Sequence, residues 1–284
     1  RSGIFMQRQY LPGMIGLQGK SPFANVGKVN SKGFDGNFSF KQRFNQVSLT
    51  VRGNMTYSKN EIIERDDANN VYPYQMQKGY RVNQNKGLIA LGLFKDYDDI
   101  RNSPQQTAWG KVQPGDIKYK DVNGDGTIDS NDQIAIGYST VAPEIYYSFH
   151  LGAEWRGIGF SAMFQGTANY SAVLNTKSMF WPLINNTTLS SHYYENRWTP
   201  ENLNAKYPRL SSQSNANNYQ TNTIWLEDRS FLKLRNVELY YKFPKNLMQK
   251  TKILGSAKLY VRGVDLLCFD KIDVADPESY GATN

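Results

Sequence analysis

The sequence predicts an all-β protein, specifically an antiparallel transmembrane β-barrel portion with long extracellular loops. Segments of about ten residues alternate between apolar and polar side chains, and long polar stretches separate them. Aromatic residues make up 13% of the 284 residues and include 19 tyrosines, whereas hydrophobic residues reach only 39%. A barrel with a polar lumen and aromatic girdles has such a composition, because only one face of each strand needs to be apolar.

The first strand pair lies around residue 45. Apolar and polar residues alternate from Val47 to Tyr57, and Phe38 and Phe40 alternate with polar neighbours just before. Period-two alternation is typical of a strand with two unlike faces. The intervening Phe44-Asn45-Gln46 is short enough for a hairpin turn.

A second strand pair has the length of a membrane-crossing hairpin. The alternation runs from Ile145 to Trp155, Arg156-Gly157 turns the chain, and a second alternation runs from Ile158 to Gln165. Strands of about ten residues cross a bilayer when tilted, whereas strands of soluble proteins average nearer five or six. The length therefore favours a membrane barrel.

Further strands are expected at about 229–243 and 256–265, the first ended by Pro244, which cannot continue a hydrogen-bonded ladder. The whole chain is expected to hold roughly ten strands. Alternation defines two faces for each strand, but it does not say which face meets lipid.

Two polar stretches, 59–107 and 168–226, have the length of outer-membrane barrel loops. Four aromatic residues of the second stretch are candidates for stacking against the apolar face of a sugar substrate: Trp181, Tyr193, Trp198 and Trp225. The alternative is that these rings fold the loop onto itself or lie at the membrane interface.

Residues 114–137 form a calcium-loop-like insertion. Its twelve-residue centre, Asp121 to Asp132, has oxygen-bearing side chains at the spacing that wraps ligands around Ca²⁺. The predicted ligands are Asp121, Asn123, Asp125, Thr127, Asp129 and Asp132. Position twelve is Asp rather than Glu, and the preceding residues alternate instead of forming a helix. The alternative is therefore a tight Asn-Gly/Asp-Gly turn without metal. No other cofactor is expected.

The sequence favours no enzymatic or nucleic-acid-binding class. It lacks a Gly-x-Ser-x-Gly elbow and a phosphate-binding loop, and two histidines are too few for a histidine metal triad. The net charge of +8 comes from Lys and Arg scattered among acids, which indicates a solvated surface. No apolar run is long enough for a membrane helix. We therefore expect neither an enzyme nor a nucleic-acid partner.

Several motifs resemble the SusC/RagA family of TonB-dependent outer-membrane transporters from Bacteroidetes. The longest runs from Pro114 through Gly126 and continues with Asp132 and Ile136-Gly137. Shorter similarities are Gly152 to Phe160, Phe231 to Val237, Asp265-Leu-Leu267 and Asp276-Pro-Glu278. Together they span most of the chain from about residue 108 onward.

The resemblance implies that residues 1–284 are the C-terminal portion of a barrel in the outer membrane of a Gram-negative bacterium. It also implies an N-terminal plug and TonB-binding segment that these residues do not include, and a last strand that is apparently missing. The implied partners are TonB, a SusD-like lipoprotein lid, outer-membrane lipid and an oligosaccharide or peptide substrate. The implied function is nutrient import.

Two other functions remain open at the level of the sequence. A secreted, calcium-stabilised β-sandwich could bind glycans through its loop aromatics, and a secreted glycan hydrolase would need a carboxylate pair that the sequence does not identify. A sandwich would stay monomeric without detergent, whereas a barrel portion would expose an apolar band with aromatic edges.

Overall fold

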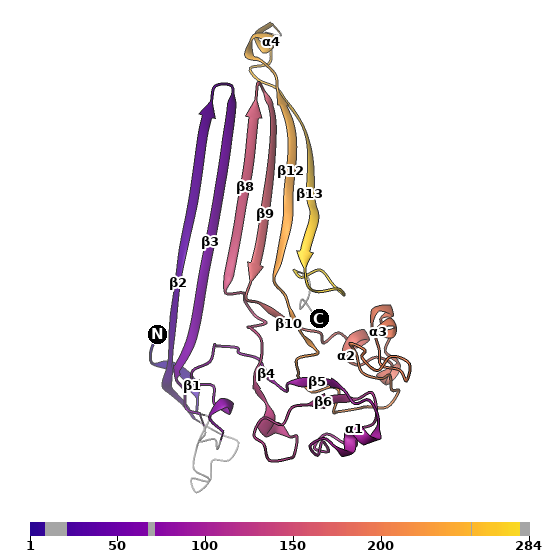
Figure 1. Cartoon of the computed structure of the whole chain (residues 1–284). Helices are drawn as coiled ribbons and strands as arrows, with labels where there is room; N and C mark the ends of the chain where they lie inside the picture. Colours follow the sequence, from indigo (N-terminus) through magenta and orange to yellow (C-terminus); the bar gives the residue numbers. More distant parts are fainter. Residues whose placement is uncertain (9–21, 68–71, 251, 279–284) are drawn as a thin grey trace.

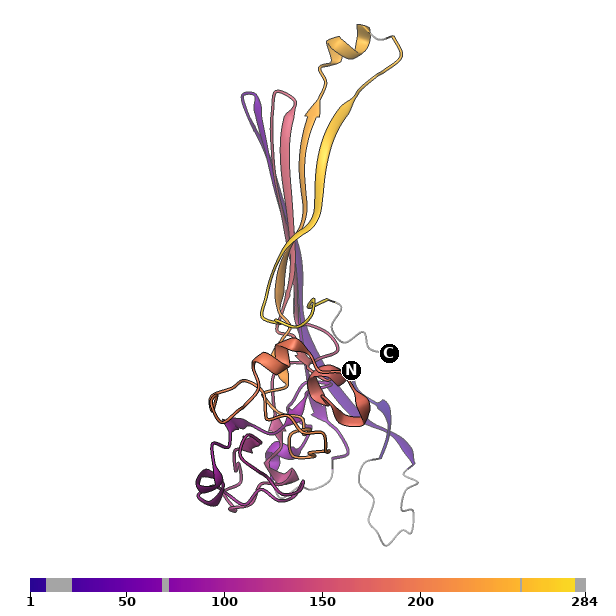
Figure 2. The same ribbon diagram turned by 90° about the vertical axis from the view of Figure 1, so that its right-hand side faces the viewer.

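The computed structural model describes residues 1–8, 22–67, 72–250 and 252–278. One tall antiparallel sheet rises above a layer of folded loops, as Figures 1 and 2 show from two sides. No helix in the described ranges is long and apolar enough to cross a membrane.

The tall sheet has seven strands in the order β1-β2-β3-β8-β9-β12-β13, and every neighbouring pair is antiparallel. Their bounds are Ile4–Gln7 (β1), Phe23–Phe44 (β2), Val47–Glu64 (β3), Ile145–Trp155 (β8), Ile158–Ala168 (β9), Phe231–Lys242 (β12) and Lys258–Asp270 (β13). The predicted strand positions and the fold class are confirmed. The expected number of roughly ten strands differs from the sheet: in the described residues the tall sheet has seven strands, six of them long, because the polar stretches form other structures.

Strand register brings most of the apolar residues of these six strands onto one side. Phe40 lies opposite Val51, Val51 opposite Leu151, Leu151 opposite Ala162, and Ala162 opposite Val237. We call this side the apolar face: even-numbered residues 34–44, odd-numbered residues 47–57 and 145–155, even-numbered residues 158–166, and in β12 and β13 Leu232, Leu234, Val237, Leu239, Tyr241, Leu259, Val261, Leu267 and Phe269.

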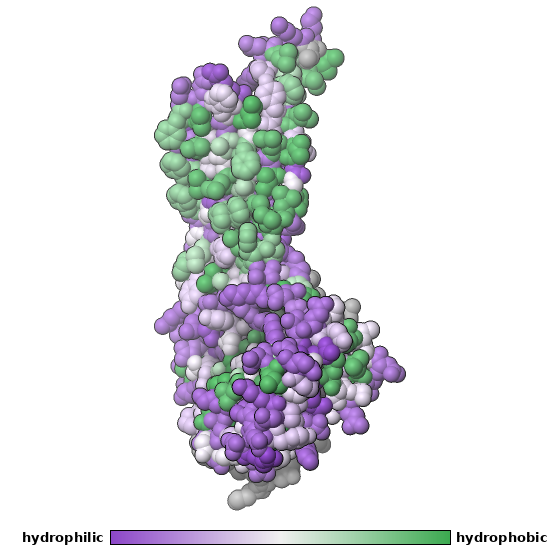
Figure 3. All heavy atoms as spheres, turned by 45° about the vertical axis from the view of Figure 1, so that its right-hand side comes forward, coloured by the Kyte–Doolittle hydropathy of each residue, from purple (hydrophilic) through white to green (hydrophobic). Residues whose placement is uncertain are grey.

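Most large side chains of the apolar face are exposed rather than covered by other parts of the chain. Phe38 is 59% exposed and Val261 is 74% exposed, and Figure 3 shows hydrophobic residues gathered as a band over the long strands. From Val47 to Tyr57 the strand advances by about 34 Å. At a tilt of roughly 40° this spans about 25 Å, the height of the lipid-facing band of an outer-membrane barrel.

A bulge at Arg235 keeps β12 in phase with its neighbours. The register shifts between Leu234 and Asn236, so Leu234 and Val237 lie on the same face although they are three residues apart. Without the extra residue, half of β12 would turn its apolar side chains to the opposite face.

The strands are joined by two-residue turns at one end. Asn45-Gln46 connects β2 to β3, and Arg156-Gly157 connects β8 to β9. Asn45, Arg156 and Gly157 have positive φ, as the favoured hairpin turns require. A Cβ on Gly157 would approach the Lys242 carbonyl oxygen to 2.6 Å, so a larger residue does not fit there. The β12–β13 connection at this end is longer and contains the helix α4 (Lys245–Lys250).

The loops at the other end fold into a layer with its own small elements. Three two-stranded sheets pair β4 with β7, β5 with β6 and β10 with β11. The strands are Lys86–Gly87 (β4), Ala90–Leu93 (β5), Ile117–Tyr119 (β6), Ile134–Ala135 (β7), Ser171–Val173 (β10) and Leu226–Asp228 (β11). The helices are Pro73–Gln75 (η2), Tyr97–Arg101 (α1), Ser130–Asp132 (η3), Lys177–Phe180 (α2), Ile184–Asn186 (η4) and Ser191–Glu195 (α3).

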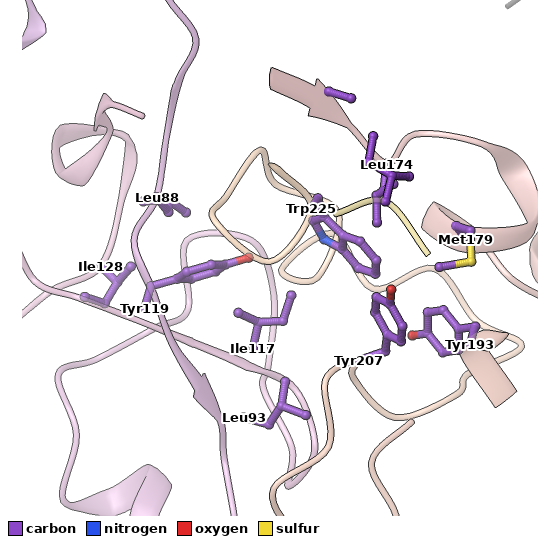
Figure 4. Close-up of a cluster of buried hydrophobic side chains, with 12 residues drawn as sticks. Leu88, Leu93, Ile117, Tyr119, Ile128, Leu174, Met179, Tyr193, Tyr207 and Trp225 are labelled. Carbon is purple, nitrogen blue, oxygen red and sulfur yellow. The ribbon is translucent and has the colours of Figure 1, made fainter. Parts of the chain in front are cut away.

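The buried hydrophobic core of the chain lies in this loop layer, not in the sheet. Figure 4 shows Leu88, Ile117, Tyr119 and Ile128 on one side of the cluster and Trp225, Tyr207 and Tyr193 on the other. Their burial removes apolar area from water. The loop layer is therefore packed around a hydrophobic core, whereas the sheet leaves most of its largest apolar side chains exposed.

Candidate functional site: the polar face and the loop aromatics

The side of the sheet opposite the apolar face carries polar side chains on all six long strands. We call it the polar face. Thr56 donates a hydrogen bond to Asp35 (2.6 Å), and Ser148 donates one to Asn54 on the neighbouring strand. If the sheet curves into a barrel with its apolar face toward lipid, this face lines the lumen.

Basic residues outnumber acidic ones on the polar face near the short turns. Glu154 forms an ion pair with Lys242 (2.6 Å between Oε2 and Nζ), and Glu238 pairs with both Lys258 and Arg262. No acid forms an ion pair with Lys41, Arg43, Arg52 or Arg156 in the part of the chain that the structure describes. An open cavity of about 660 Å³ lies here, lined by Lys41, Arg43, Gln46, Ser48, Glu154, Arg156, Gly157 and Lys242. This end of the polar face is therefore suited to binding anionic groups.

Two of the four predicted substrate-binding aromatics lie inside the loop core. Trp225 is 1% exposed and Tyr193 is 2% exposed, and both rings stack on Tyr207, with centroids 5.8 Å and 5.0 Å apart. Burial raises the pKa of the Tyr193 hydroxyl. The prediction is wrong for these two residues, because the core leaves them no free face for a sugar.

The other two aromatics differ from each other. Trp198 is half-buried against the core, and its indole ring lies over Gly115, where an added Cβ would come within 2.5 Å of it. Gly115 has φ +86°, which also favours glycine. Trp181 alone among the four is exposed, at 43%.

Trp181 lines a cavity of about 430 Å³ in the loop layer. Its ring meets Tyr219 edge-on at 6.1 Å, and Phe180 joins both rings to Trp225 of the core. Apart from Ile184, the remaining lining residues are polar or small: Lys177, Asn185, Thr187, Ser214, Ala216 and Gln220. We call this the Trp181 pocket. Aromatic floors with amides and hydroxyls at the rim suit a polar ligand that has an apolar face.

Tyr219 and Lys177 are site residues that the sequence reasoning missed. Tyr219 lies 38 positions after Trp181, within an Asn- and Ser-rich run without alternation. The loop layer brings them together, and no local periodicity could have indicated it.

Asp116 joins segments of the loop layer that lie far apart in the sequence. Its buried Oδ1 accepts hydrogen bonds from Arg209 (2.8 Å), Asn215 (2.8 Å) and Asn218 (3.1 Å). Its Oδ2 accepts from the backbone of Gln113 at 2.8 Å. The Gly115-Asp116 step therefore fixes the 113–119 segment against residues 209–218.

The Asp121–Asp132 segment is a turn closed by its own amides. The two carboxylate oxygens of Asp121 accept from the backbone N–H groups of Gly124 (2.7 Å) and Gly126 (2.8 Å). Asp132 is buried and accepts from those of Val122 (2.7 Å) and Asp129 (2.9 Å). These contacts match the turn alternative.

Among the residues that the structure places, no three His, Cys, Asp or Glu side chains gather as a metal-ligating group. The carboxylates of Asp121 and Asp132 accept hydrogen bonds from amides of the same segment. A calcium site would also draw on amide, hydroxyl and carbonyl oxygens, since Ca²⁺ takes six to eight oxygen ligands. Calcium binding therefore stays a prediction.

Comparisons with known proteins agree with this architecture. The chain is 28% identical over 206 residues to TonB-dependent receptor P26 of Formosa agariphila, which covers 68% of the chain and 19% of that receptor. It is 24% identical over 271 residues to TonB-dependent receptor P3 of the same organism, which covers 91% of the chain and 26% of the receptor. No family model matches the sequence.

The fold matches that of the RagAB peptide transporter, with a TM-score of 0.69 at 22% identity, over 98% of this chain and 29% of that one. The chain thus spans less than a third of the length of each of these relatives. These relatives are receptors and transporters, which agrees with the expectation that the chain is not an enzyme. The sequence relatives, which are TonB-dependent receptors, and the shared fold together support a resemblance of this chain to part of a SusC/RagA-like TonB-dependent transporter of the outer membrane.

Proposed function

We propose that the chain forms part of the wall of an outer-membrane nutrient importer. The observation that carries the proposal is the register, which places apolar residues on one face of six long strands and polar residues on the other. The apolar face meets lipid, and the polar face lines the substrate path. The chain performs no covalent chemistry in this function.

The orientation of the wall follows from its connections. Outer-membrane barrels have short turns on the periplasmic side and long loops outside. The Asn45-Gln46 and Arg156-Gly157 turns then lie toward the periplasm, and the loop layer lies at the cell surface. A SusD-like lipoprotein would cover the loop layer, and TonB would act from the periplasmic side through a part of the protein outside these residues.

The substrate in this proposal is an oligosaccharide or a peptide, and the Trp181 pocket is its contact in the loop layer. The pocket joins an exposed indole to amide and hydroxyl side chains, so it can stack on a sugar or an apolar side chain while bonding its polar groups. It opens at the surface of the layer that the lid protein would cover.

A pair of matched variants tests this contact. Trp181→Ala should weaken substrate binding several-fold, because an aromatic contact is worth about 0.5–1.5 kcal/mol. Tyr194→Ala is the control, because Tyr194 is an exposed aromatic residue of the same loop layer outside the pocket. The measurement is the affinity of the purified protein for a panel of oligosaccharides and peptides. Equal affinities for both variants and the unchanged protein would remove the pocket from the substrate path.

The soluble β-sandwich alternative is wrong. A sandwich packs a second sheet on the apolar face of the first, about 10 Å away. In the described ranges the three smaller sheets belong to the loop layer, and the large residues of the apolar face remain exposed.

A further inference from the structure

One rim of the apolar face carries an unusual pair of lysines. Lys32 of β2 and Lys59 of β3 are directly opposite each other, and the next pair toward the apolar band is Phe34 and Tyr57. The two rings pack with centroids 5.9 Å apart. Because side chains two residues apart share a face, both ammonium groups lie on the lipid side at the loop end of the band.

This pair is electrostatically unfavourable in isolation. Opposite residues on antiparallel strands have Cβ atoms about 4.5–5.5 Å apart, and like charges there destabilise the sheet. No described acid forms an ion pair with Lys32 or Lys59, although Glu61 lies one row further out on the same face. By contrast, Lys28, four residues before Lys32, forms an ion pair with Glu64 of the neighbouring strand at 3.9 Å, so its charge is balanced by an acid.

The two lysines line a cavity together with the aromatic pair. The cavity is about 450 Å³, and its lining includes Lys32, Lys59, Phe34, Tyr57, Asn30 and Glu61. Its side toward the membrane core is therefore aromatic, and its side toward the aqueous rim carries the two lysines beside Asn30, Asn60 and Glu61. A membrane lipid has the same order of polarity, because its apolar acyl chains lie toward the membrane core and its charged headgroup lies toward the aqueous rim.

We propose that Lys32 and Lys59 bind the phosphate of an anionic membrane lipid whose acyl chains lie along Phe34 and Tyr57. A phosphate between the two ammonium groups turns their repulsion into two charge-assisted contacts. Lone interfacial lysines need only reach water, but a facing pair above an aromatic pair gives one headgroup two donors. The proposal rests on the lipid-facing apolar face and is independent of the substrate of the transporter.

The test measures lipid retention on the protein purified from outer membranes in mild detergent. Native mass spectrometry would count phosphatidylglycerol and, separately, phosphatidylcholine bound over a range of lipid concentrations. We expect preferential retention of phosphatidylglycerol. The K32Q/K59Q variant should retain it roughly thirty-fold more weakly, because each lysine attracts the anionic headgroup independently and both charges are removed. K32R/K59R, which keeps both charges, should retain the lipid.

The control is K28Q/K95Q, which removes the same total charge from exposed positions outside the cavity. It should leave retention unchanged, and heat-modified gel migration would show that every variant is folded. Equal loss in the control and K32Q/K59Q would overturn the proposal in favour of overall charge. Unchanged retention in K32Q/K59Q would also overturn it. Displacement by millimolar inorganic phosphate would show a free-anion site instead of a lipid site, and co-purification of a protein at this position that K32Q/K59Q releases would show a protein interface.

Discussion

At the scale of single residues, Asp116 is the side chain on which the loop layer depends most. It is fully buried, and its ion pair with Arg209 and its amide contacts join segments about a hundred residues apart. Asp116→Ala would leave the partly buried guanidinium of Arg209 without its partner. Breaking such a pair costs about 3–5 kcal/mol.

We therefore expect Asp116→Ala to open the loop layer while the sheet stays folded. Hydrogen exchange should rise at 113–119 and 209–218 but not in the long strands. Asp98→Ala is the control, because Asp98 pairs with Arg101 on the surface and such pairs contribute little. Unchanged exchange in Asp116→Ala would show that the loops are held by other contacts.

The Asp121–Asp132 segment carries a second prediction at this scale. If it binds Ca²⁺, its side chains must exchange some amide hydrogen bonds for the metal. Calorimetry at millimolar Ca²⁺ should then give heat with the unchanged protein and none with Asp121→Asn. Absence of heat with the unchanged protein would leave the segment as the closed turn that the hydrogen bonds describe.

At the scale of elements, the two faces of β2 make opposite predictions for neighbouring residues. Phe38 belongs to the middle of the apolar face, and Asn37 to the polar face. An arginine at the bilayer midplane costs about 2–4 kcal/mol, so Phe38→Arg should lower the folded fraction in outer membranes. Asn37→Arg should not. Both are read as heat-modified migration on gels, and equal losses would contradict the assignment of the faces.

The loop layer should loosen in alkali. Burial raises the pKa of Tyr119, Tyr193 and Tyr207 above the ordinary value of 10.0. These groups stay neutral when folded and ionise near pH 10 when unfolded, so their stabilising effect is complete below pH 10 and declines as the pH rises above it.

Near-ultraviolet circular dichroism should therefore show loss of loop packing above about pH 10. Tyr119→Phe should lessen the pH dependence while costing about 1 kcal/mol at neutral pH, because the hydroxyl bonds the Asn217 carbonyl (2.6 Å) and the Asn222 amide (3.0 Å). Tyr194→Phe, at an exposed residue, should change neither. A transition that is unaffected by Tyr119→Phe would contradict this cause.

The elements differ in how well the sequence predicts them. Alternation is local, so the β8–β9 hairpin and its Arg156-Gly157 turn were predicted closely. β2 begins at Phe23, whereas the alternation in the sequence indicated a strand only from about Phe38. The first half of β2 is polar and glycine-rich and lies outside the apolar band, so it lacks that alternation. The lipid-facing side required the register between strands, and the burial of Trp225 required contacts among distant loops.

At the scale of the whole molecule, the chain divides its hydrophobic residues between two solvents. The loop layer buries Leu88, Ile117 and Trp225 away from water, whereas the sheet exposes Phe34, Leu151 and Val261. In the described part of the chain β13 pairs with β12 alone, so its other edge is open.

Spin-label accessibility along β2 tests this division most directly. Single cysteines at each position from 34 to 44, in a Cys268→Ser background, would be labelled in protein reconstituted in lipid. Even-numbered labels should collide with oxygen dissolved in the bilayer, and odd-numbered labels with a water-soluble nickel reagent, in strict alternation. Labels of both parities that are equally accessible to the water-soluble reagent would contradict a sheet whose apolar face meets lipid.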